Sequence, residues 1–288
     1  MTPTLSLEDL VARTTDLPTL PVAALAVMRE AESSTASAQS VAHILQQDQS
    51  LTVRVLRLAN SAFYGLSRRV LDPQEAVVIL GMRSVRNLAI VAGTYPWLAK
   101  PLQGYCLGPN ELWSHSFGVA VGAQLVANRT ENADADAAFT AGLLHNIGKV
   151  ALSIWLEGKM AGLLDIAERA GLAFDEIERK MLGFDHAEVG AHLAEKWNLP
   201  TALVAPIRYH HRPSAAEPAS YLVDAVHVGD YLAMSIGLGL SGEGLRYSFD
   251  GACLERLGIT SDDLDELSLD FITSYNQHEK LFEEAVTA

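Results

Sequence analysis

The chain has 288 residues, 49% of them hydrophobic, and a formal net charge of −14. This length and composition suffice for two compact domains or one large bilobed domain. An acidic surface repels nucleic-acid phosphate, which argues against general binding of DNA or RNA. The two cysteines, Cys106 and Cys253, lie far apart, so neither a disulfide framework nor a zinc site of paired thiolates is expected.

The N-terminal segment is acidic and lacks an apolar run, so we expect neither a signal peptide nor an anchor. No stretch approaches about 18 consecutive apolar residues, so no membrane span is expected. The sequence therefore predicts a soluble, cytoplasmic protein. The best candidates for a local basic patch are four arginines, although arginines spaced along helices are usually solvated or paired: Arg54, Arg57, Arg83 and Arg86.

Helical periodicity runs through the first hundred residues, and no strand or internal repeat is expected. A short first helix would be capped by Ser6, and Pro21 would lie in the first turn of the next. Asp72 followed by Pro73 is a clear helix start. The helices expected in this half after the first cover residues 21–33, 40–47, 50–60, 73–81 and 84–98.

Residues 101–110 contain two prolines and two glycines and are the best candidate for a linker. We therefore expect an all-α, two-lobed helical bundle, with an N-terminal lobe over residues 1–103 and a second lobe over 104–288. Asp136 and Asp185 are expected helix caps in the second lobe. Its expected helices cover residues 111–128, 136–145, 152–170, 174–182, 186–197, 198–212, 221–236 and 261–288, with a glycine-rich break at 237–244.

The stretch Ala141-Gly-Leu-Leu-His-Asn-Ile-Gly-Lys-Val150 places His145 and Asn146 at the end of a buried helix, next to Lys149. Imidazole and carboxylate groups are common metal ligands, and helical bundles build metal sites from ligands on separate helices. The groups elsewhere in the chain that can meet this stretch are His115, His186, His210, His211 and Asp230.

Each of these residues also has a structural interpretation. An inward-facing histidine is more often a hydrogen-bonded core group than a ligand. Asp230 lies in a strongly apolar run, where a buried carboxylate needs a partner or a metal. Side chains of helical neighbours such as His210 and His211 diverge by about 100°, so we expect these two to serve different ions or one to support the other. We expect the other histidines to lie at the surface or to pack: His43, His192, His227 and His278.

The order His115, His145-Asn146, His186, His210-His211, Asp230 resembles the HD superfamily of metal-dependent phosphohydrolases, most closely the branch that includes HD-GYP cyclic-di-GMP phosphodiesterases. Further upstream motifs are Leu17-Pro18-Thr19-Leu20-Pro21, Asp48, Leu56-Arg57-Leu58-Ala59-Asn60-Ser61, Tyr64-Gly65, Ala76 and Leu80-Gly81. These motifs resemble the HDOD family, the HD-related output domains of bacterial signalling proteins. The resemblance covers roughly residues 15–235. It implies an N-terminal helical bundle joined to an HD-like lobe, and a regulatory module without established catalysis.

The chain departs from the enzyme pattern in three places. Asn146 replaces the aspartate of the HD pair, yet two dications about 3.5–4 Å apart need bridging negative charge. Arg212 stands where the His-His-Glu motif has an acid, and residues 213–218 replace the Gly-Tyr-Pro motif. A single ion on His115, His145 and Asp230 is still compatible with the pattern, as is a pocket that binds a ligand or only packs.

The sequence favours a non-catalytic signal-transduction module that contacts signalling proteins, with one divalent zinc, iron, manganese or nickel ion as the candidate cofactor. Such a module needs no nucleic acid or membrane, and a homodimer is compatible with it. The alternative is a metal-dependent phosphodiesterase of HD type acting on a nucleotide or cyclic dinucleotide. In that enzyme Asp230 would hold the metal and Lys149 would contact phosphate, although Lys149 is also a favourable helix-end residue.

Overall fold

The computed structural model describes Leu7, Leu10 and residues 20–61, 64–130, 133–238 and 248–287. The described residues form helices and connecting turns without a strand, apart from one antiparallel bridge between Leu102 and Leu107. The predicted all-α class is confirmed. The expected cap at Ser6, the motif at residues 17–19 and the glycine-rich stretch beyond Leu238 lie outside the described residues.

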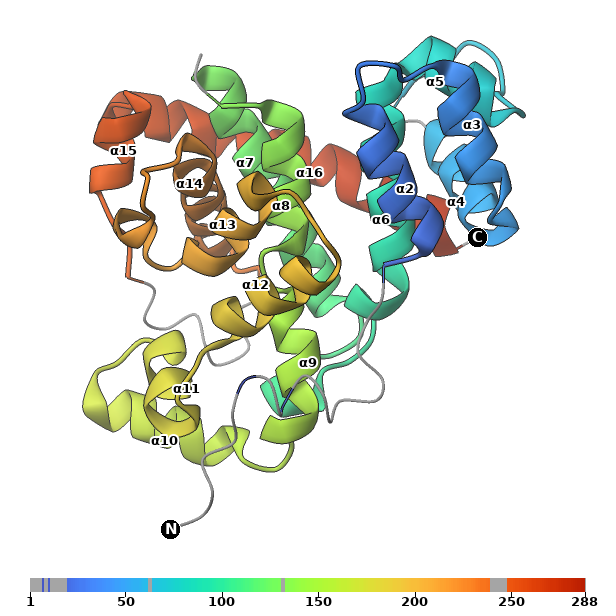
Figure 1. Cartoon of the computed structure of the whole chain (residues 1–288). Helices are drawn as coiled ribbons and strands as arrows, with labels where there is room; N and C mark the ends of the chain where they lie inside the picture. The colour runs from blue at the N-terminus through green and yellow to red at the C-terminus, as the bar shows by residue number, and fades with distance from the viewer. Residues whose placement is uncertain are drawn as a thin grey trace. The chain divides into compact units, whose positions relative to one another are not determined.

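The chain divides into two compact units (Figure 1). The larger comprises Met1–Pro18 and Trp97–Ile272, and the smaller comprises Thr19–Pro96 and Thr273–Ala288. This division falls a few residues before the expected linker. It also differs from the expected lobes, 1–103 and 104–288, because the long last helix, α16 (Ser261–Thr287), contributes its second half to the smaller unit.

The smaller unit packs short amphipathic helices around one apolar core. They are α2 (Val22–Ala31), α3 (Ala38–Gln46), α4 (Gln49–Ala59), α5 (Pro73–Leu80) and α6 (Met82–Leu98) up to Pro96. Asp72 caps α5 from the position expected. Of the four candidate basic-patch arginines, Arg54 donates to the Ala92 carbonyl and Arg86 is buried beside Glu32. These two arginines therefore support the fold of this unit.

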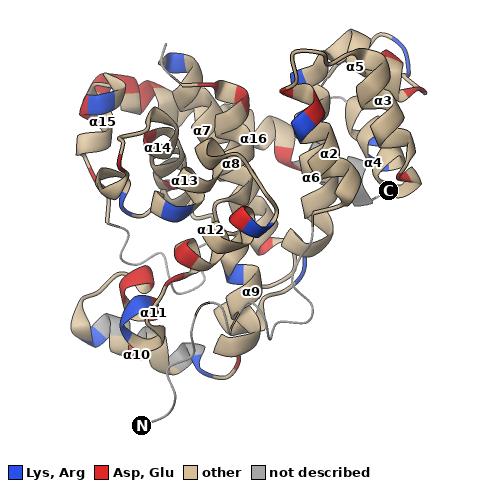
Figure 2. Cartoon of the chain, in the orientation of Figure 1, with Lys and Arg blue, Asp and Glu red and all other residues tan. Residues whose placement is uncertain are grey.

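The larger unit is built around α7 (Glu111–Arg129), which is buried over most of its length and carries Asp, Glu, Lys or Arg only at its two ends (Figure 2). Its helices after the short 3-10 turn at Gln103–Tyr105 are α7 (Glu111–Arg129), α8 (Ala135–Leu144), α9 (Ile147–Leu156), α10 (Met160–Ala170), α11 (Phe174–Leu182), α12 (His186–Lys196), α13 (Thr201–Tyr209), α14 (Tyr221–Ser235), α15 (Ala252–Leu257) and the first half of α16. A second 3-10 turn covers Pro213–Ala215. Both α8 and α14 pack along α7, which brings the helices that carry the candidate residues together.

Glycines at the helix crossings allow this close packing. A Cβ on Gly229 of α14 would lie 2.5 Å from the backbone nitrogen of Ala123 on α7. A Cβ on Gly148 of α9 would lie only 1.8 Å from the carbonyl oxygen of His186, where α12 begins. Since backbone atoms cannot give way as a flexible side chain does, both positions require glycine.

Three helix ends differ from the sequence expectation. The cap of α8 is Asp134, whose carboxylate accepts two backbone N–H groups, and Asp136 lies in the first turn instead. The expected helix over residues 152–170 is broken after Leu156, near Gly158, which has a positive φ of 73°. Finally, α13 ends at Tyr209 rather than near Arg212, so the His210-His211 pair lies in the following turn.

One stretch of the described chain, Ala135–Leu156, is long and apolar enough to cross a membrane. It consists of α8, α9 and the two residues between them, and 83% of its most apolar window is buried inside the fold. Its apolarity is therefore explained by its place in the core of the larger unit.

Candidate metal centre

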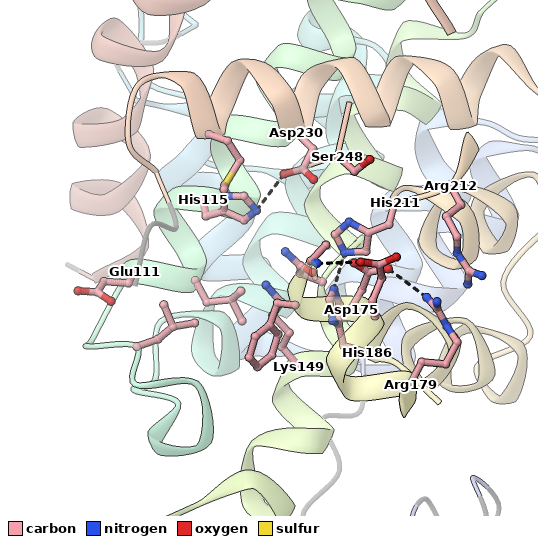
Figure 3. A pocket seen from close by; sticks show the side chains of 17 residues that line it. Glu111, His115, Lys149, Asp175, Arg179, His186, His211, Arg212, Asp230 and Ser248 are labelled. Atoms are coloured by element: carbon pink, nitrogen blue, oxygen red, sulfur yellow. Dashed lines mark hydrogen bonds and ion pairs between the residues drawn. The ribbon is translucent and has the colours of Figure 1, made fainter. Parts of the chain in front are cut away.

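Among the described residues of the larger unit, two groups of candidate ligand atoms occur, and within each group the atoms are no more than 4.8 Å apart. Cluster 1 consists of His115 on α7, His145 at the end of α8 and Asp230 on α14. The Nε2 atom of His115 lies 3.3 Å from Oδ1 of Asp230 (Figure 3). It also lies 3.3 Å from Nε2 of His145. All three side chains are buried.

The hydrogen bonds around cluster 1 decide which ring nitrogens carry lone pairs. Nδ1–H of His115 donates to the Leu238 carbonyl at 3.2 Å, and Nδ1–H of His145 donates to the Gly142 carbonyl at 2.6 Å. In a neutral imidazole with a protonated Nδ1, the lone pair is on Nε2. Both Nε2 atoms and the carboxylate of Asp230 are therefore acceptors that face one another. A cation bound between them would stabilise this arrangement.

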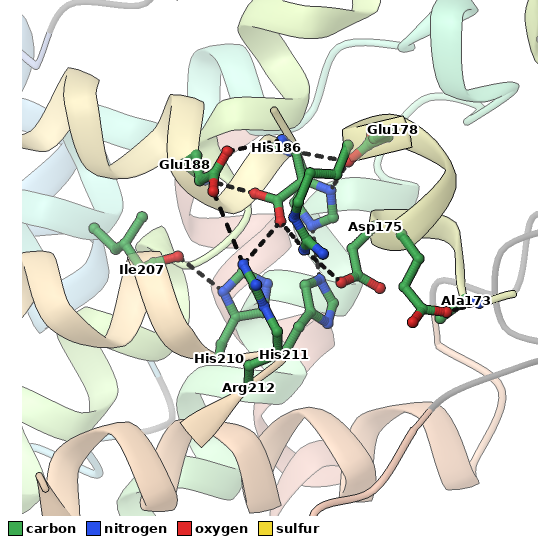
Figure 4. Close-up of polar contacts among 12 residues, drawn as sticks. Ala173, Asp175, Glu178, His186, Glu188, Ile207, His210, His211 and Arg212 are labelled. Atoms are coloured by element: carbon green, nitrogen blue, oxygen red, sulfur yellow. Dashed lines mark hydrogen bonds and ion pairs between the residues drawn. The ribbon is translucent and has the colours of Figure 1, made fainter. Parts of the chain in front are cut away.

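Cluster 2 consists of His186 at the start of α12 and the pair His210-His211 after α13 (Figure 4). The Nε2 atoms of His186 and His211 lie 2.9 Å apart. Nδ1–H of His210 donates to the Ile207 carbonyl at 2.9 Å, whereas its buried Nε2 has no hydrogen-bond partner among the described residues. The lone pair of this Nε2 is therefore available to bind a metal ion.

The expected divergence of His210 and His211 is wrong. Their ring centroids are 4.0 Å apart, and their ligand atoms lie in the same cluster. The expectation assumed that both residues belong to a continuing helix, but α13 ends at Tyr209. In the turn that follows α13, the rings of both residues lie beside the ring of His186.

A buried carboxylate, Glu178 on α11, binds His186 of cluster 2 at Nδ1, the ring nitrogen that does not face His211. Its Oε2 accepts the ring Nδ1–H of His186 at 2.6 Å and the backbone N–H of the same residue at 2.9 Å. The hydroxyl of Tyr105 donates to its Oε1 at 2.5 Å. Such a carboxylate fixes the ring orientation and makes Nε2 a better ligand. Neither Glu178 nor Tyr105 was predicted from the sequence; a single acid on an amphipathic helix, such as Glu178, usually faces solvent.

Burial keeps most of these histidines neutral. It lowers the pKa of His115 to about 3, and it lowers the pKa of His145 and of His210 well below the usual value. His186 differs: burial is the largest single influence and lowers its pKa, but the charge and the hydrogen bond of the Glu178 carboxylate and the charge of Asp185 together outweigh it, and the net shift is upward. Because neutral imidazole is the metal-binding form, burial prepares His115, His145 and His210 for a cation.

The two clusters adjoin, since the rings of His145 and His210 meet edge to face with centroids 4.9 Å apart. Asn146 caps α9 with its backbone only, and its buried Oδ1 has no hydrogen-bond partner in the described part of the chain. An amide oxygen can bind a cation but carries no net charge. The donor atoms of both clusters thus fit a divalent transition metal, and Asp230 is the one anionic group among these clustered ligands.

A cavity of about 140 Å³ opens onto both clusters (Figure 3). It is lined by His115 and Asp230 from cluster 1 and by His186 and His211 from cluster 2, together with Asn146. The charged side chains that also line it are Lys149, Arg179, Arg212, Glu111, Asp175 and Glu176. The ammonium of Lys149, which is almost fully buried, lies 5.6 Å above the ring of Tyr105.

The structure gathers every residue that the sequence analysis proposed as a metal ligand around this cavity or its two clusters. Their role as ligands stays a prediction. Of the four histidines assigned to the surface or to packing, His227 is fully buried. Its Nδ1–H donates to the His210 carbonyl at 2.6 Å, and its Nε2 accepts the backbone N–H of Asp250 at 3.0 Å. Through these bonds His227 holds the turn that carries His210.

In a comparison with known families, the model of the HDOD domain matches residues 17–213. An uncharacterized protein of Treponema pallidum (strain Nichols) is 31% identical over 216 residues, which are 74% of this chain. The aligned region spans 41% of that relative's length.

Solved structures resemble the chain over nearly its whole length. An HDOD domain protein with unknown function from Geobacter sulfurreducens is 26% identical with a TM-score of 0.75, and the alignment covers 98% of this chain and 97% of that one. A protein of Shewanella amazonensis SB2B that carries the name of a proposed phosphohydrolase is 28% identical with a TM-score of 0.71, covering 96% and 97% of the two chains.

Proposed function

Because the chain belongs to the HDOD domain family, we propose that it is a cytoplasmic signal-transduction module that acts through contacts with other proteins and does not hydrolyse phosphodiesters. Its HD-type pocket binds one divalent transition metal. The observation that carries the proposal is Asn146: a neutral amide, with a buried oxygen that no described donor satisfies, stands where a two-metal site needs a bridging carboxylate.

Electrostatics favours one ion over two. Two dications about 4 Å apart repel each other by roughly 17 kcal/mol at an effective dielectric constant near 20. The ligand atoms of both clusters oppose this repulsion with the single negative charge of Asp230, and the buried cation of Lys149 lies on the wall of the same cavity. One dication, by contrast, is well matched by two neutral imidazoles and one carboxylate.

Cluster 1 is the proposed metal site, with His115, His145 and Asp230 as ligands. A zinc, iron, manganese or nickel ion bound there would supply a Lewis-acid centre. The hydrogen bonds from Nδ1–H of both histidines to backbone carbonyls hold the two rings with Nε2 towards the ion. Without a bridging carboxylate, the protein alone does not hold the second ion that two-metal phosphodiester hydrolysis uses.

A second candidate function is metal-dependent hydrolysis of a phosphoester, and three observations support it. Both ligand clusters are present, Lys149 lines the cavity between them, and the Shewanella relative carries a phosphohydrolase name. A cavity of about 140 Å³ is, however, far below the roughly 300–1,000 Å³ typical of ligand pockets. This size favours small phosphoesters over a cyclic dinucleotide as the substrate of such a hydrolase.

Purified untagged protein tests the two functions directly. Its metal content is measured by elemental analysis, and hydrolysis of bis-p-nitrophenyl phosphate and cyclic di-GMP is followed with added zinc, iron, manganese or nickel. We expect about one metal ion per chain and no turnover. Turnover that the Asp230→Ala variant lacks would establish the hydrolase instead. The Asn146→Asp/Arg212→Glu double variant, which restores the acids of the enzyme motifs, shows whether the assay can detect a repaired site.

A further inference from the structure

We infer that a small dianionic oxyanion, such as inorganic phosphate or a phosphate monoester, and a second divalent cation bind this pocket together, each raising the affinity of the other. The inference rests on the proposed function, since it starts from a pocket that holds one metal ion in the absence of the anion. It assigns the pocket a ligand class and a way of responding to that ligand.

The donors for a second cation are already in place. Cluster 2 offers three imidazoles, and the buried Nε2 of His210 has no protein partner within the described residues. Glu178 orients His186 through Nδ1, which directs Nε2 towards His211 at 2.9 Å. Cluster 2 therefore lacks no ligand atom. What it lacks is a negatively charged ligand, because all three of its ligands are neutral when they bind a metal.

The cavity is where that missing charge can enter. Members of both clusters line it, so an anion inside it can contact a cation on either side. Asn146, in the place of the absent carboxylate, lines the same wall. The volume of about 140 Å³ is close to that of a cavity that admits one benzene molecule, which suits a tetrahedral oxyanion with few further atoms.

The charges of the cavity wall explain why binding of the anion and binding of the second cation depend on each other. Among the described residues, three cations line it, Lys149, Arg179 and Arg212, and four acids line it, Glu111, Asp175, Glu176 and Asp230. Arg179 pairs with Asp175 and Asp185, and Arg212 lies near Asp185 and Glu188. Before metal binds, the described residues of this wall carry one more acid than cations, so they do not attract an anion. Two dications reverse the sign of this net charge, and a dianion between them relieves their repulsion.

Thermodynamic linkage then makes the effect reciprocal: phosphate strengthens binding of the second cation as much as the second cation strengthens binding of phosphate. A coupling of roughly tenfold or more is the usual size of such linkage. The Asn146 side chain is what makes the coupling necessary, because a carboxylate at this position would supply the bridging charge permanently.

Equilibrium dialysis against cobalt(II) measures the effect, with inorganic phosphate in one buffer and chloride at the same ionic strength in the other. For the wild-type chain we expect about one cobalt in chloride and about two in phosphate, with phosphate retained only when cobalt is present. Asn146→Asp should bind about two in both buffers. His211→Gln, with its fold checked by circular dichroism, should bind about one in both buffers.

The outcomes separate this inference from the proposed function. One cobalt per chain in both buffers would overturn the inference and leave the single-metal module standing. No cobalt in either buffer, or two in chloride, would overturn the single-metal site itself. Phosphate binding to the metal-free chain would contradict the coupling, because it would show that the anion needs no second cation.

Discussion

Gly148 lies where α9 crosses α12, next to His186 of cluster 2. Its replacement by alanine tests whether this crossing holds His186 in position. The added Cβ would lie 1.8 Å from the carbonyl oxygen of His186 and 2.6 Å from the backbone nitrogen of Gly190. Both obstacles are backbone atoms, so the two helices must separate by on the order of 1.5 Å to restore ordinary contact.

Overpacking of a close-packed core costs about 1–3 kcal/mol, and a backbone collision belongs at the upper end of that range. At about 2–4 °C per kcal/mol for a domain of this size, Gly148→Ala should lower Tm by roughly 6–12 °C. Thermal unfolding followed by far-UV circular dichroism measures this shift. Because the same separation moves His186 away from His211, the phosphate-dependent second cobalt should also be lost.

Gly162→Ala is the matched control, since this glycine lies on α10 and a Cβ there would meet nothing within 4 Å. Alanine at an open helical position should stabilise the chain by about 0.5–1 kcal/mol. If Gly148→Ala kept the wild-type Tm and cobalt stoichiometry, the claim that the α9–α12 crossing holds cluster 2 in place would be refuted.

Three further predictions concern the supporting residues. Glu178→Gln should weaken the phosphate-dependent second cobalt about 10–100-fold in dialysis, because His186 loses its orienting carboxylate. Arg256→Met should lower stability by roughly 2–3 kcal/mol in thermal unfolding, since buried Asp224 loses a two-point ion pair with bonds of 2.9 and 2.6 Å. Cys106 is exposed and should react rapidly with a thiol reagent at pH 8, whereas Cys253 is fully buried, burial raises its pKa to about 12, and it should react only after unfolding.

Each of these predictions has a clear contrary result. Unchanged cobalt affinity in Glu178→Gln would mean that this carboxylate only packs. Arg129→Ala serves as the control for Arg256→Met, because its ion pairs with Asp263 and Glu266 are solvent-exposed and should leave Tm unchanged. Equal losses in the two arginine variants would contradict the importance of burial. Two rapidly reacting thiols in the folded chain would contradict the burial of Cys253.

The sequence predicted the all-α class and the family resemblance, which the HDOD match confirms. It also selected the residues that meet around the cavity, because a histidine or an aspartate on an otherwise apolar helix face must point inwards. His115 and Asp230 are clear examples, and both are buried in the structure. Their helices are adjacent because Gly122 and Gly229 allow close contact, a pairing that the spacing of residues within one helix does not reveal.

The arrangement of cluster 2 was harder to predict. The end of α13 at Tyr209 has no glycine or proline next to it in the sequence, so the turn that brings His210 and His211 together was not expected. Glu178 was missed for a related reason: its helix has an ordinary amphipathic pattern, and its burial depends on Tyr105 and His186 from other segments. Both features depend on tertiary contacts, which override local periodicity.

We propose that Asn146 leaves a one-metal site where a carboxylate at the same position would give a two-metal site. The most direct test is the metal content of untagged protein, purified by gel filtration without chelator or phosphate and compared with the Asn146→Asp variant. We expect about one equivalent of zinc, iron, manganese or nickel in the wild-type chain and about two in the variant. Two equivalents in both proteins, or none in either, would contradict the claim.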